Sequence, residues 1–391
     1  MINASARRAI YTDFIFFLFA ITAYLPTIIA PVLLGGLNQA GEISLTQMAY
    51  IGTIELLATG LASMLAPRYF PVSAIRSIGF VAAVISMIVN LVSIKVSGDA
   101  LMLVRFIAGI ADGVLIWTLY EHASRTKNPE RILGIFYLVL ILVGFVVTLI
   151  ATNFFVLKFG VHSLFLFFAG LCAVCALLAY SVPNRFGEKY ILDDEAIANK
   201  RMPVAAMLVV LNVFLFNAFT GLVWIYWAPI AELSGFSGEM SGTMSAVSLA
   251  FQLGGIIVST IIASRVPQFF VSITVHGVAV ACIAYAMSAP GQTGFIAFSM
   301  VFGFVMYFVS PFAVSLAAMT DPSRRSVTML APAIFLGSTF GPLLASVFVS
   351  ETNVGGGVAV AVVLCAGALI ALVLSTVLHH RSVPERNVAA I

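Results

Sequence analysis

Three ionisable residues, Glu55, Arg105 and Asp112, lie well inside long apolar stretches of the sequence. Arg105 and Asp112 belong to the segment "RFIAGIADGVLIW", and their seven-residue spacing places them on one helix face, about 10 Å apart along the axis. Apolar surroundings favour the protonated form of a carboxyl group, and a nearby arginine favours the ionised form. A carboxyl that gains or loses its arginine can therefore release or bind a proton, so these three residues predict a proton-coupling site.

The energetic cost of these charges limits what they can face. A charge at the centre of a spanning helix costs about 2.5–3.5 kcal/mol, whereas two charges about 10 Å apart attract by only about 1.7 kcal/mol at an effective dielectric constant of about 20. Pairing between Arg105 and Asp112 alone does not offset this cost, so we expect both to face a cavity or a partner helix. The alternative to coupling is a fixed charge network that holds together the helices carrying Glu55 and Arg105.

The composition indicates a protein surrounded mostly by lipid. The chain has 391 residues, of which 61% are hydrophobic and 9% are charged, whereas a soluble domain has about 25% charged residues. The net charge of +3 is too small to indicate a nucleic-acid partner. The four cysteines lie in apolar runs and have no metal-ligand spacing with a histidine, so no cofactor, metal or disulfide framework is expected.

Helices long enough to cross a bilayer account for most of the chain. A bilayer core of about 30 Å takes about 20 helical residues. Measured against this length, the sequence contains twelve apolar runs. They lie near residues 13–34, 46–66, 77–96, 100–121, 132–156, 161–182, 204–230, 240–263, 269–288, 294–318, 327–349 and 355–378.

The basic residues test the order of these spans, because cytoplasmic loops carry an excess of Lys and Arg. With the N-terminus in the cytoplasm and twelve alternating spans, the cytoplasmic side receives Arg7, Arg8, Arg68, Arg76, Arg125, Lys127, Arg131, Arg185, Lys189, Lys200, Arg201, Arg265, Arg324, Arg325, Arg381 and Arg386. The opposite side receives only Lys95 and Lys158, and Arg105 lies within a span. The sequence therefore predicts an all-α integral membrane protein with both termini in the cytoplasm.

The spans divide into two halves that resemble each other weakly. The polar segment "NRFGEKYILDDEAIANKR" follows the sixth run, so we predict an N-terminal six-helix bundle over 1–182, a cytoplasmic linker over 183–203 and a C-terminal six-helix bundle over 204–391. The stretch "TGLASMLAPRYFP" around Arg68 is similar to "GIIVSTIIASRVP" around Arg265, and Gly144 corresponds to Gly337 at a similar offset. Such a repeat is typical of transporters that rock one bundle against the other around a midplane site.

These features resemble the major facilitator superfamily over essentially the whole chain. The segment "LVRFIAGIADG" looks like the family's Arg-x-x-x-Gly motif on the fourth helix, carried by Arg105 and Gly109. The loop "ASMLAPRYFPVSAIR" looks like a decayed form of the family's Gly-x-x-x-Asp-Arg-x-Gly-Arg loop, with Arg68 at the first arginine and Pro67 in place of the aspartate. The fifth helix lacks the Gly-Pro motif of drug/proton antiporters.

The resemblance implies two six-helix bundles related by a pseudo-two-fold axis, with a cavity lined by the first, fourth, seventh and tenth helices. Asp112, on the fourth helix, is therefore favoured over Glu55 as the proton carrier. The candidate substrate contacts are Arg105, Tyr24, Asn217, Gln252 and Tyr307. The alternative for the uncharged residues among them is an interhelical hydrogen bond.

Gating residues are expected at both ends of the cavity. Arg68 would act at the cytoplasmic end, and Trp224 and Trp227 would form an outer gate, the alternative being an aromatic belt at the membrane surface. Among polar residues near span ends or inside spans, Asp13 is expected to cap a helix, Glu121 and His122 to be solvated, and His276 to be a hydrogen-bonded packing residue.

The predicted function is secondary active transport by alternating access. The solute would be small, organic and amphipathic, for example a carboxylate. It would move by symport coupled to protons, with Na⁺ as the alternative coupling ion. Proton-antiport efflux of lipophilic compounds is the main alternative, and a membrane enzyme or a sensor is disfavoured because no nucleophile cluster, metal set or nucleotide-binding loop is found. A monomer in the cytoplasmic (inner or plasma) membrane is expected.

Overall fold

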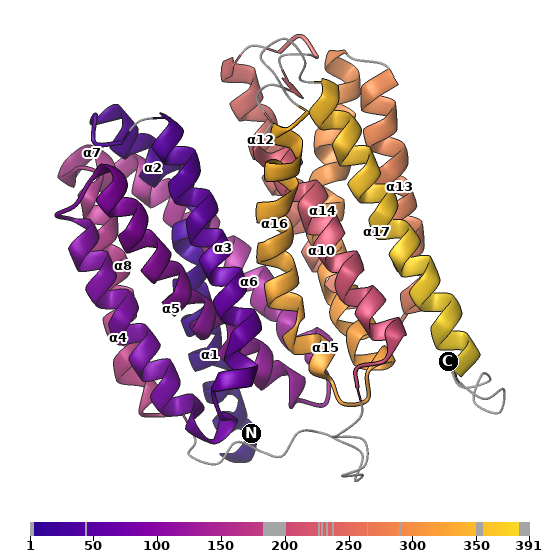
Figure 1. The fold of residues 1–391 in the computed structure, drawn as a ribbon, viewed down its shortest axis with the longest axis horizontal. Helices are drawn as coiled ribbons and strands as arrows, with labels where there is room; N and C mark the ends of the chain where they lie inside the picture. The colour runs from indigo at the N-terminus through magenta and orange to yellow at the C-terminus, as the bar shows by residue number, and fades with distance from the viewer. Residues whose placement is uncertain are drawn as a thin grey trace. The chain divides into compact units, whose positions relative to one another are not determined.

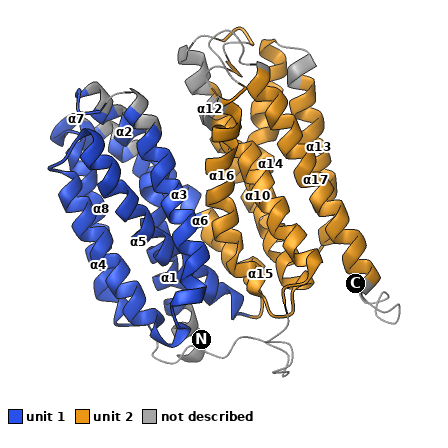
Figure 2. Cartoon of the chain, in the orientation of Figure 1, with its two compact units in different colours: residues 1–126, 139–189 blue, residues 127–138, 190–391 orange. Residues whose placement is uncertain are grey.

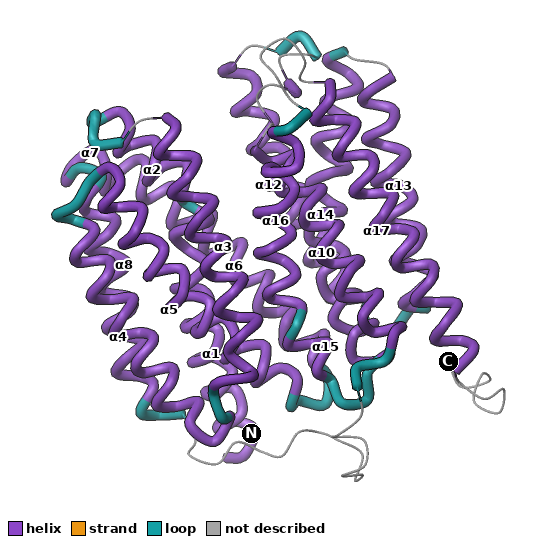
Figure 3. The backbone as a smooth tube through the Cα atoms, viewed as in Figure 1, coloured by secondary structure: helices purple, strands orange, loops and turns teal. Residues whose placement is uncertain are grey.

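A computed structural model describes residues 4–43, 45–182, 201–225, 227, 230–231, 234–236, 238–263, 265–288, 291–348 and 355–382. Within these residues the regular structure is helical and contains no β-strand (Figures 1 and 3). The helices are long and apolar, so they satisfy their own backbone hydrogen bonds in a solvent that offers none.

The chain folds as two compact units (Figure 2). Unit 1 comprises residues 1–126 and 139–189, and unit 2 comprises residues 127–138 and 190–391. Most of the predicted linker, residues 183–200, lies outside the described residues. The predicted boundaries at 182 and 203 therefore stay predictions.

Unit 1 is a bundle of long helices with short connecting pieces. Its elements are α1 (Ala4–Ile28), α2 (Ala30–Gln39), α3 (Leu45–Tyr69), a 3-10 turn (Val72–Ala74), α4 (Ile75–Ser93), α5 (Gly98–Ser124), α6 (Pro129–Ile150), a π-helical stretch (Ala151–Phe155), α7 (Val156–Phe159) and α8 (His162–Ala179). Residues 129–138 of α6 belong to unit 2, and the rest of α6 belongs to unit 1.

Unit 2 is a second bundle. Its elements are α10 (Val204–Ile225), α12 (Gly238–Ile262), α13 (Gln268–Ser288), α14 (Gln292–Thr320), α15 (Arg325–Thr328), α16 (Leu330–Ser346) and α17 (Gly355–Ser382). Pro311 lies inside α14, which continues through it.

The first predicted span differs from the structure. The apolar run 13–34 corresponds to two helices, α1 and α2, which together extend from Ala4 to Gln39. The break falls at Ile29, two residues before Pro31. Pro31 has no backbone N–H to continue the hydrogen-bond ladder of α1, but proline is tolerated in the first turn of a helix, where it lies in α2.

The described helices match the length and composition of membrane spans. Eleven are long and apolar enough to cross a membrane, and α12 adds a shorter apolar stretch, Val247–Ile262. Large apolar side chains are exposed along them, for example Leu103, Leu177 and Val363, which are 63%, 73% and 70% exposed. A soluble protein rarely exposes such a surface, whereas lipid covers it, so the chain is a multi-pass membrane protein.

The same helix pairs pack in both units, as the internal repeat predicts. In unit 1, α5 packs against α3, α4 and α1, and in unit 2, α14 packs against α12, α13 and α10. A Cβ placed on Gly144 of α6 would meet Ile28 of α1, and one placed on Gly337 of α16 would meet Phe214 of α10. The sequence correspondence between Gly144 and Gly337 therefore holds in three dimensions.

His276 is hydrogen-bonded inside unit 2, as expected for a packing residue. Its Nδ1 lies 2.8 Å from the Ser272 carbonyl, so Nδ1 carries the proton and Nε2 accepts from the Asn212 amide at 3.0 Å. The same Asn212 nitrogen also donates to the Ala368 carbonyl at 2.9 Å. These bonds tie α10, α13 and α17 together.

Replacing Asn212 with Leu is expected to lower the free energy of unfolding by about 1–3 kcal/mol, because the buried His276 Nε2 and Ala368 carbonyl lose their donor. Thermal unfolding of the purified protein in detergent measures this. The control is Thr274→Val on α13, where an exposed hydroxyl bonds only its own helix at Phe270. Equal melting curves for the Asn212 variant and the control would contradict the assignment.

Candidate functional site

Two glycines bring α3 and α5 of unit 1 into close contact. A Cβ placed on Gly109 would overlap the Glu55 carbonyl oxygen, and one placed on Gly113 would overlap the Thr59 carbonyl oxygen. Four residues make about one helical turn, so Gly109 and Gly113 form a groove along one face of α5. The backbone of α3 lies in this groove, which explains the glycine of the Arg-x-x-x-Gly pattern.

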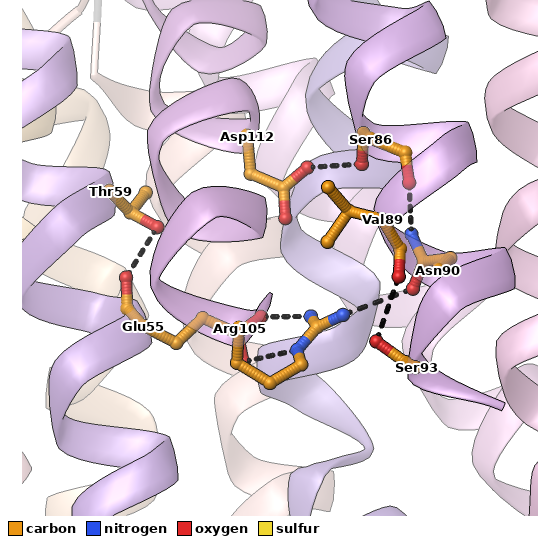
Figure 4. A network of polar contacts seen from close by, with 8 residues as sticks. All are labelled: Glu55, Thr59, Ser86, Val89, Asn90, Ser93, Arg105 and Asp112. Carbon is orange, nitrogen blue, oxygen red and sulfur yellow. Dashed lines mark hydrogen bonds and ion pairs between the residues drawn. The ribbon is translucent and has the colours of Figure 1, made fainter. Parts of the chain in front are cut away.

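Arg105 forms a buried ion pair with Glu55 across this contact (Figure 4). Its Nε donates to Oε2 of Glu55 at 2.9 Å, and its Nη2 donates to the other carboxylate oxygen, Oε1. Its Nη1 donates to Oδ1 of Asn90 on α4 at 3.1 Å, and the guanidinium lies 5.8 Å from the ring centre of Phe165 on α8. The Arg105 side chain is 1% exposed and that of Glu55 is 12% exposed.

Asp112 is buried nearby and has a different kind of partner. The Ser86 hydroxyl on α4 donates to its Oδ1 at 2.9 Å, and Asp112 is 2% exposed. Asn90 donates to the Ser86 carbonyl at 2.8 Å, so α4 connects Asp112 to the Arg105 pair (Figure 4). Among the described residues, no ion pair reaches Asp112.

The buried cluster therefore holds one guanidinium and two carboxyl groups. Glu55 takes two of the Arg105 donors, which leaves Asp112 without a cation of its own. The expectation that Arg105 and Asp112 face a partner helix instead of lipid is confirmed: both contact α4, and Arg105 contacts α3 as well. The Glu55–Arg105 pair also supplies the contact between the second and fourth spans that the fixed-network alternative requires.

Ser86 and Asn90 were missing from the predicted site. They lie four residues apart in "SMIVNLVS", with Ser93 three residues further, so all three fall on one face of α4. Three polar residues on one face of an otherwise apolar span are a sequence signal for a buried polar partner. The residue that they face, however, depends on the register between α4 and α5.

The other candidate substrate contacts lie on separate helices. Tyr24 is buried on α1 in unit 1. In unit 2, Asn217 of α10 donates to the carbonyl of Val213 in its own helix at 2.8 Å, and the ring of Tyr307 on α14 lies 5.9 Å from that of Tyr137 on α6. Gln252 of α12 is 3% exposed, and its amide nitrogen has no hydrogen-bond partner in the described part of the chain.

The candidate gating residues have contrasting environments. The ring centres of Trp224 and Trp227 lie 5.8 Å apart. Trp227 is 6% exposed, and its ring centre lies 5.2 Å from that of Phe295 and 5.9 Å from that of Phe302. This burial inside unit 2 argues against an aromatic belt at the membrane surface for Trp227. Arg68 is exposed on the last turn of α3.

Two expectations about the polar ends of the spans were wrong. Asp13 caps no helix, since it lies inside α1 with its Oδ1 2.6 Å from Nε2 of His122. Glu121 and His122 are not solvated: Glu121 is 3% exposed and accepts a 2.8 Å bond from Arg125, and His122 stacks on Phe16. Asp13 and Phe16 of α1 contact His122 of α5, and spacing along one helix does not reveal such a contact.

Comparison with known proteins decides the family. The sequence matches the family described as the Major Facilitator Superfamily over residues 12–331, which is most of the chain.

The chain belongs to the major facilitator superfamily.

Solved structures of this superfamily share the fold. The fucose:proton symporter FucP of E. coli, in a form with one residue replaced, superposes with a TM-score of 0.68 at 13% identity, covering 94% of this chain and 98% of that chain. FucP in the outward conformation gives 0.70 at 15% identity with the same coverage. The human organic anion transporter MFSD10 (TETRAN) gives 0.66 at 14% identity, covering 94% and 99%. No curated protein matches the sequence.

Membership in the superfamily, the all-helical fold and the apolar helices together identify a membrane transporter. The Arg105 and Gly109 resemblance drawn from the sequence is thereby confirmed at the level of the family. At 13–15% identity the structural neighbours establish the fold alone.

Proposed function

We propose that this transporter carries a small amphipathic organic solute, such as a carboxylate, across the membrane by proton-coupled symport, with Asp112 as the proton carrier. The observation that carries the proposal is the charge balance of the buried cluster. One guanidinium serves two carboxyl groups, and Glu55 already holds it through two hydrogen bonds. Protonation of Asp112 makes the cluster neutral, and a buried cluster is less costly when neutral.

Asp112 has the contacts that a carboxyl needs to change its protonation state. The Ser86 hydroxyl donates to the ionised carboxylate, and the same hydroxyl can rotate to accept from the protonated acid. Arg105 attracts the ionised form from within the same cluster. A small movement of α4 or α5 changes both contacts, because Ser86, Asn90 and Arg105 lie on these two helices.

Glu55 and Arg105 have a different role in this proposal. Their ion pair fixes α3 against α5, and the three hydrogen bonds of Arg105, two to Glu55 and one to Asn90, occupy its guanidinium from two sides. Arg105 therefore acts on the coupling site through its charge, and direct contact with the solute would require the Asn90 or Glu55 bond to break.

The solute chemistry follows from the groups available in unit 2. Gln252 offers an amide donor with no hydrogen-bond partner among the described residues, Tyr307 and Asn217 offer polar atoms, and Trp227 lies in an aromatic cluster. No acidic or basic residue lies deep in the apolar part of the described spans of α10, α12, α13, α14, α16 and α17. Such groups suit an amphipathic molecule better than a highly charged one. The organic anion transporter MFSD10, which shares this fold, supports organic acids as the first solutes to test.

We further propose that the chain crosses the membrane twelve times, with both termini in the cytoplasm. The protein would be a monomer in the cytoplasmic membrane. The eleven long apolar helices and the apolar stretch Val247–Ile262 supply twelve candidate spans. The distribution of Lys and Arg supports the orientation.

Transport into proteoliposomes tests the proposed function. The purified protein would be reconstituted and given an inward proton gradient, an outward proton gradient or a sodium gradient, with panels of organic acids and lipophilic amines outside. Accumulation of an organic acid with the inward proton gradient, abolished by a protonophore, is the expected result. Uptake of lipophilic compounds driven by the outward gradient would instead show antiport, and a requirement for the sodium gradient would replace the proton by Na⁺.

A further inference from the structure

A cavity of about 530 Å³ lies inside unit 2. It lies where α6 begins, at Pro129, and where α12 ends, at Ile262. Its volume falls in the range of about 300–1,000 Å³ that small-molecule sites occupy. None of the residues that line it belongs to the proposed coupling site.

Two arginines from different helices line this cavity, Arg131 on the first turn of α6 and Arg265 just after α12. Neither guanidinium has an ion pair or a hydrogen bond to another side chain within the described residues. The cavity contains one acid, Glu130, and its carboxylate interacts electrostatically with a third arginine, Arg324. The cavity therefore carries positive charge that the protein itself does not neutralise.

The rest of the cavity lining includes one threonine and two isoleucines. Thr260 also lines the cavity, and its buried hydroxyl, next to Gly134, has no hydrogen-bond partner in the described part of the chain. Ile135 and Ile261 also line it and are 36% and 55% exposed. An unpartnered buried hydroxyl costs free energy unless a water molecule or a ligand satisfies it.

We propose that this cavity binds the phosphate group of an anionic ligand, with Arg131 and Arg265 as its two cationic contacts. Guanidinium groups match phosphate oxygens in geometry and charge. The two arginines lie where the apolar parts of α6 and α12 end, which is the level of lipid headgroups, and the exposed Ile135 and Ile261 lie beside them. A phospholipid headgroup and a soluble organic phosphate share this chemistry.

Titration of the full-length protein by native mass spectrometry, in a neutral detergent, tests the proposal. The probes are phosphatidylglycerol, phosphatidylcholine and glycerol 3-phosphate. The variants are Arg131→Gln/Arg265→Gln, Thr260→Val and, as a matched control, Arg381→Gln, which removes an exposed arginine from the last turn of α17. Melting curves check that each variant is folded.

The wild type is expected to bind phosphatidylglycerol more tightly than phosphatidylcholine. The double variant is expected to lose about tenfold or more in affinity for phosphatidylglycerol, because both charge-assisted contacts to the phosphate are removed. Thr260→Val is expected to lose a few-fold, and Arg381→Gln to bind as the wild type does. If only glycerol 3-phosphate shows this dependence on the two arginines, the site stands and its ligand is a soluble phosphate.

Two results would overturn the proposal. One is binding of all three probes by Arg131→Gln/Arg265→Gln with wild-type affinity. The other is an equal loss in Arg381→Gln, since the attraction would then come from the overall positive charge of this face and not from a site.

Discussion

Glu55→Gln is expected to lower the free energy of unfolding by about 3–5 kcal/mol, because it leaves the buried Arg105 guanidinium without its ion-pair partner. Arg105 is 1% exposed, so water cannot replace the lost carboxylate. The double variant Glu55→Gln/Arg105→Gln removes both charges and is expected to recover most of this loss. The single losses should therefore not add, as holds for residues that share one ion pair.

Thermal or denaturant unfolding of the purified variants measures this coupling. Glu42→Gln is the matched control, because it removes a carboxylate from a more exposed pair. The Glu42 side chain is 26% exposed and that of its partner His162 is 36% exposed. Exposed pairs contribute only about 0–1 kcal/mol. If Glu55→Gln unfolds with a free energy within about 1 kcal/mol of the wild type, Asp112 can replace Glu55 as the partner of Arg105. The proposal that Glu55 holds Arg105 while Asp112 carries the proton would then be wrong.

Gly109→Val is expected to cost about 3 kcal/mol or more, at the upper end of the usual range for overpacking. The new side chain would overlap the backbone carbonyl of Glu55 and the Cβ of Ala58, and a backbone atom cannot turn away as a side chain can. Helices α3 and α5 would have to separate, which would stretch the Arg105–Glu55 pair one turn away. The variant should therefore lose transport as well as stability.

Gly170→Val on α8 is the control for Gly109→Val. No atom lies within 4 Å of the position where a Cβ on Gly170 would stand. This control should keep the wild-type melting temperature within a few degrees and keep transport. Equal stability of the two variants, measured as melting temperature and as the fraction of monodisperse protein, would show that the α3–α5 contact is not close.

The helices were predictable because a bilayer imposes a length and an apolar composition on each span. The structure places a helix in each of the twelve predicted runs, with boundaries that shift by several residues where local chemistry intervenes, as at Pro31. The correspondence between Gly144 and Gly337 was also visible in the sequence, since repeated halves keep small residues at equivalent helix contacts. The family could be recognised from Arg105 and Gly109, whose spacing fits one helix face.

The partners of the buried charges were harder to predict. The seven-residue spacing of Arg105 and Asp112 describes one helix, whereas their partners, Glu55 and Ser86, come from α3 and α4. Which residues meet across two helices depends on their rotation and register, and a single sequence contains no direct record of either. The contact between Asp13 and His122 was missed for the same reason.

The central claim is that Asp112 carries the coupled proton, and solute accumulation by Asp112→Asn in proteoliposomes tests it most directly. Asparagine keeps the shape of the side chain and can still accept from Ser86, but it cannot change its charge. Asp99→Asn is the matched control on the same helix, where Asp99 accepts an exposed bond from Gln47. Each pH unit of gradient supplies about 1.4 kcal/mol per proton, which corresponds to about tenfold accumulation in one-proton symport.

The wild type and Asp99→Asn are expected to concentrate the solute when the proton gradient points inward. Asp112→Asn should exchange solute across the membrane but accumulate none, with inside and outside concentrations equal at steady state. Accumulation by Asp112→Asn to the wild-type level would contradict the claim and would make Asp112 a structural residue of the buried cluster.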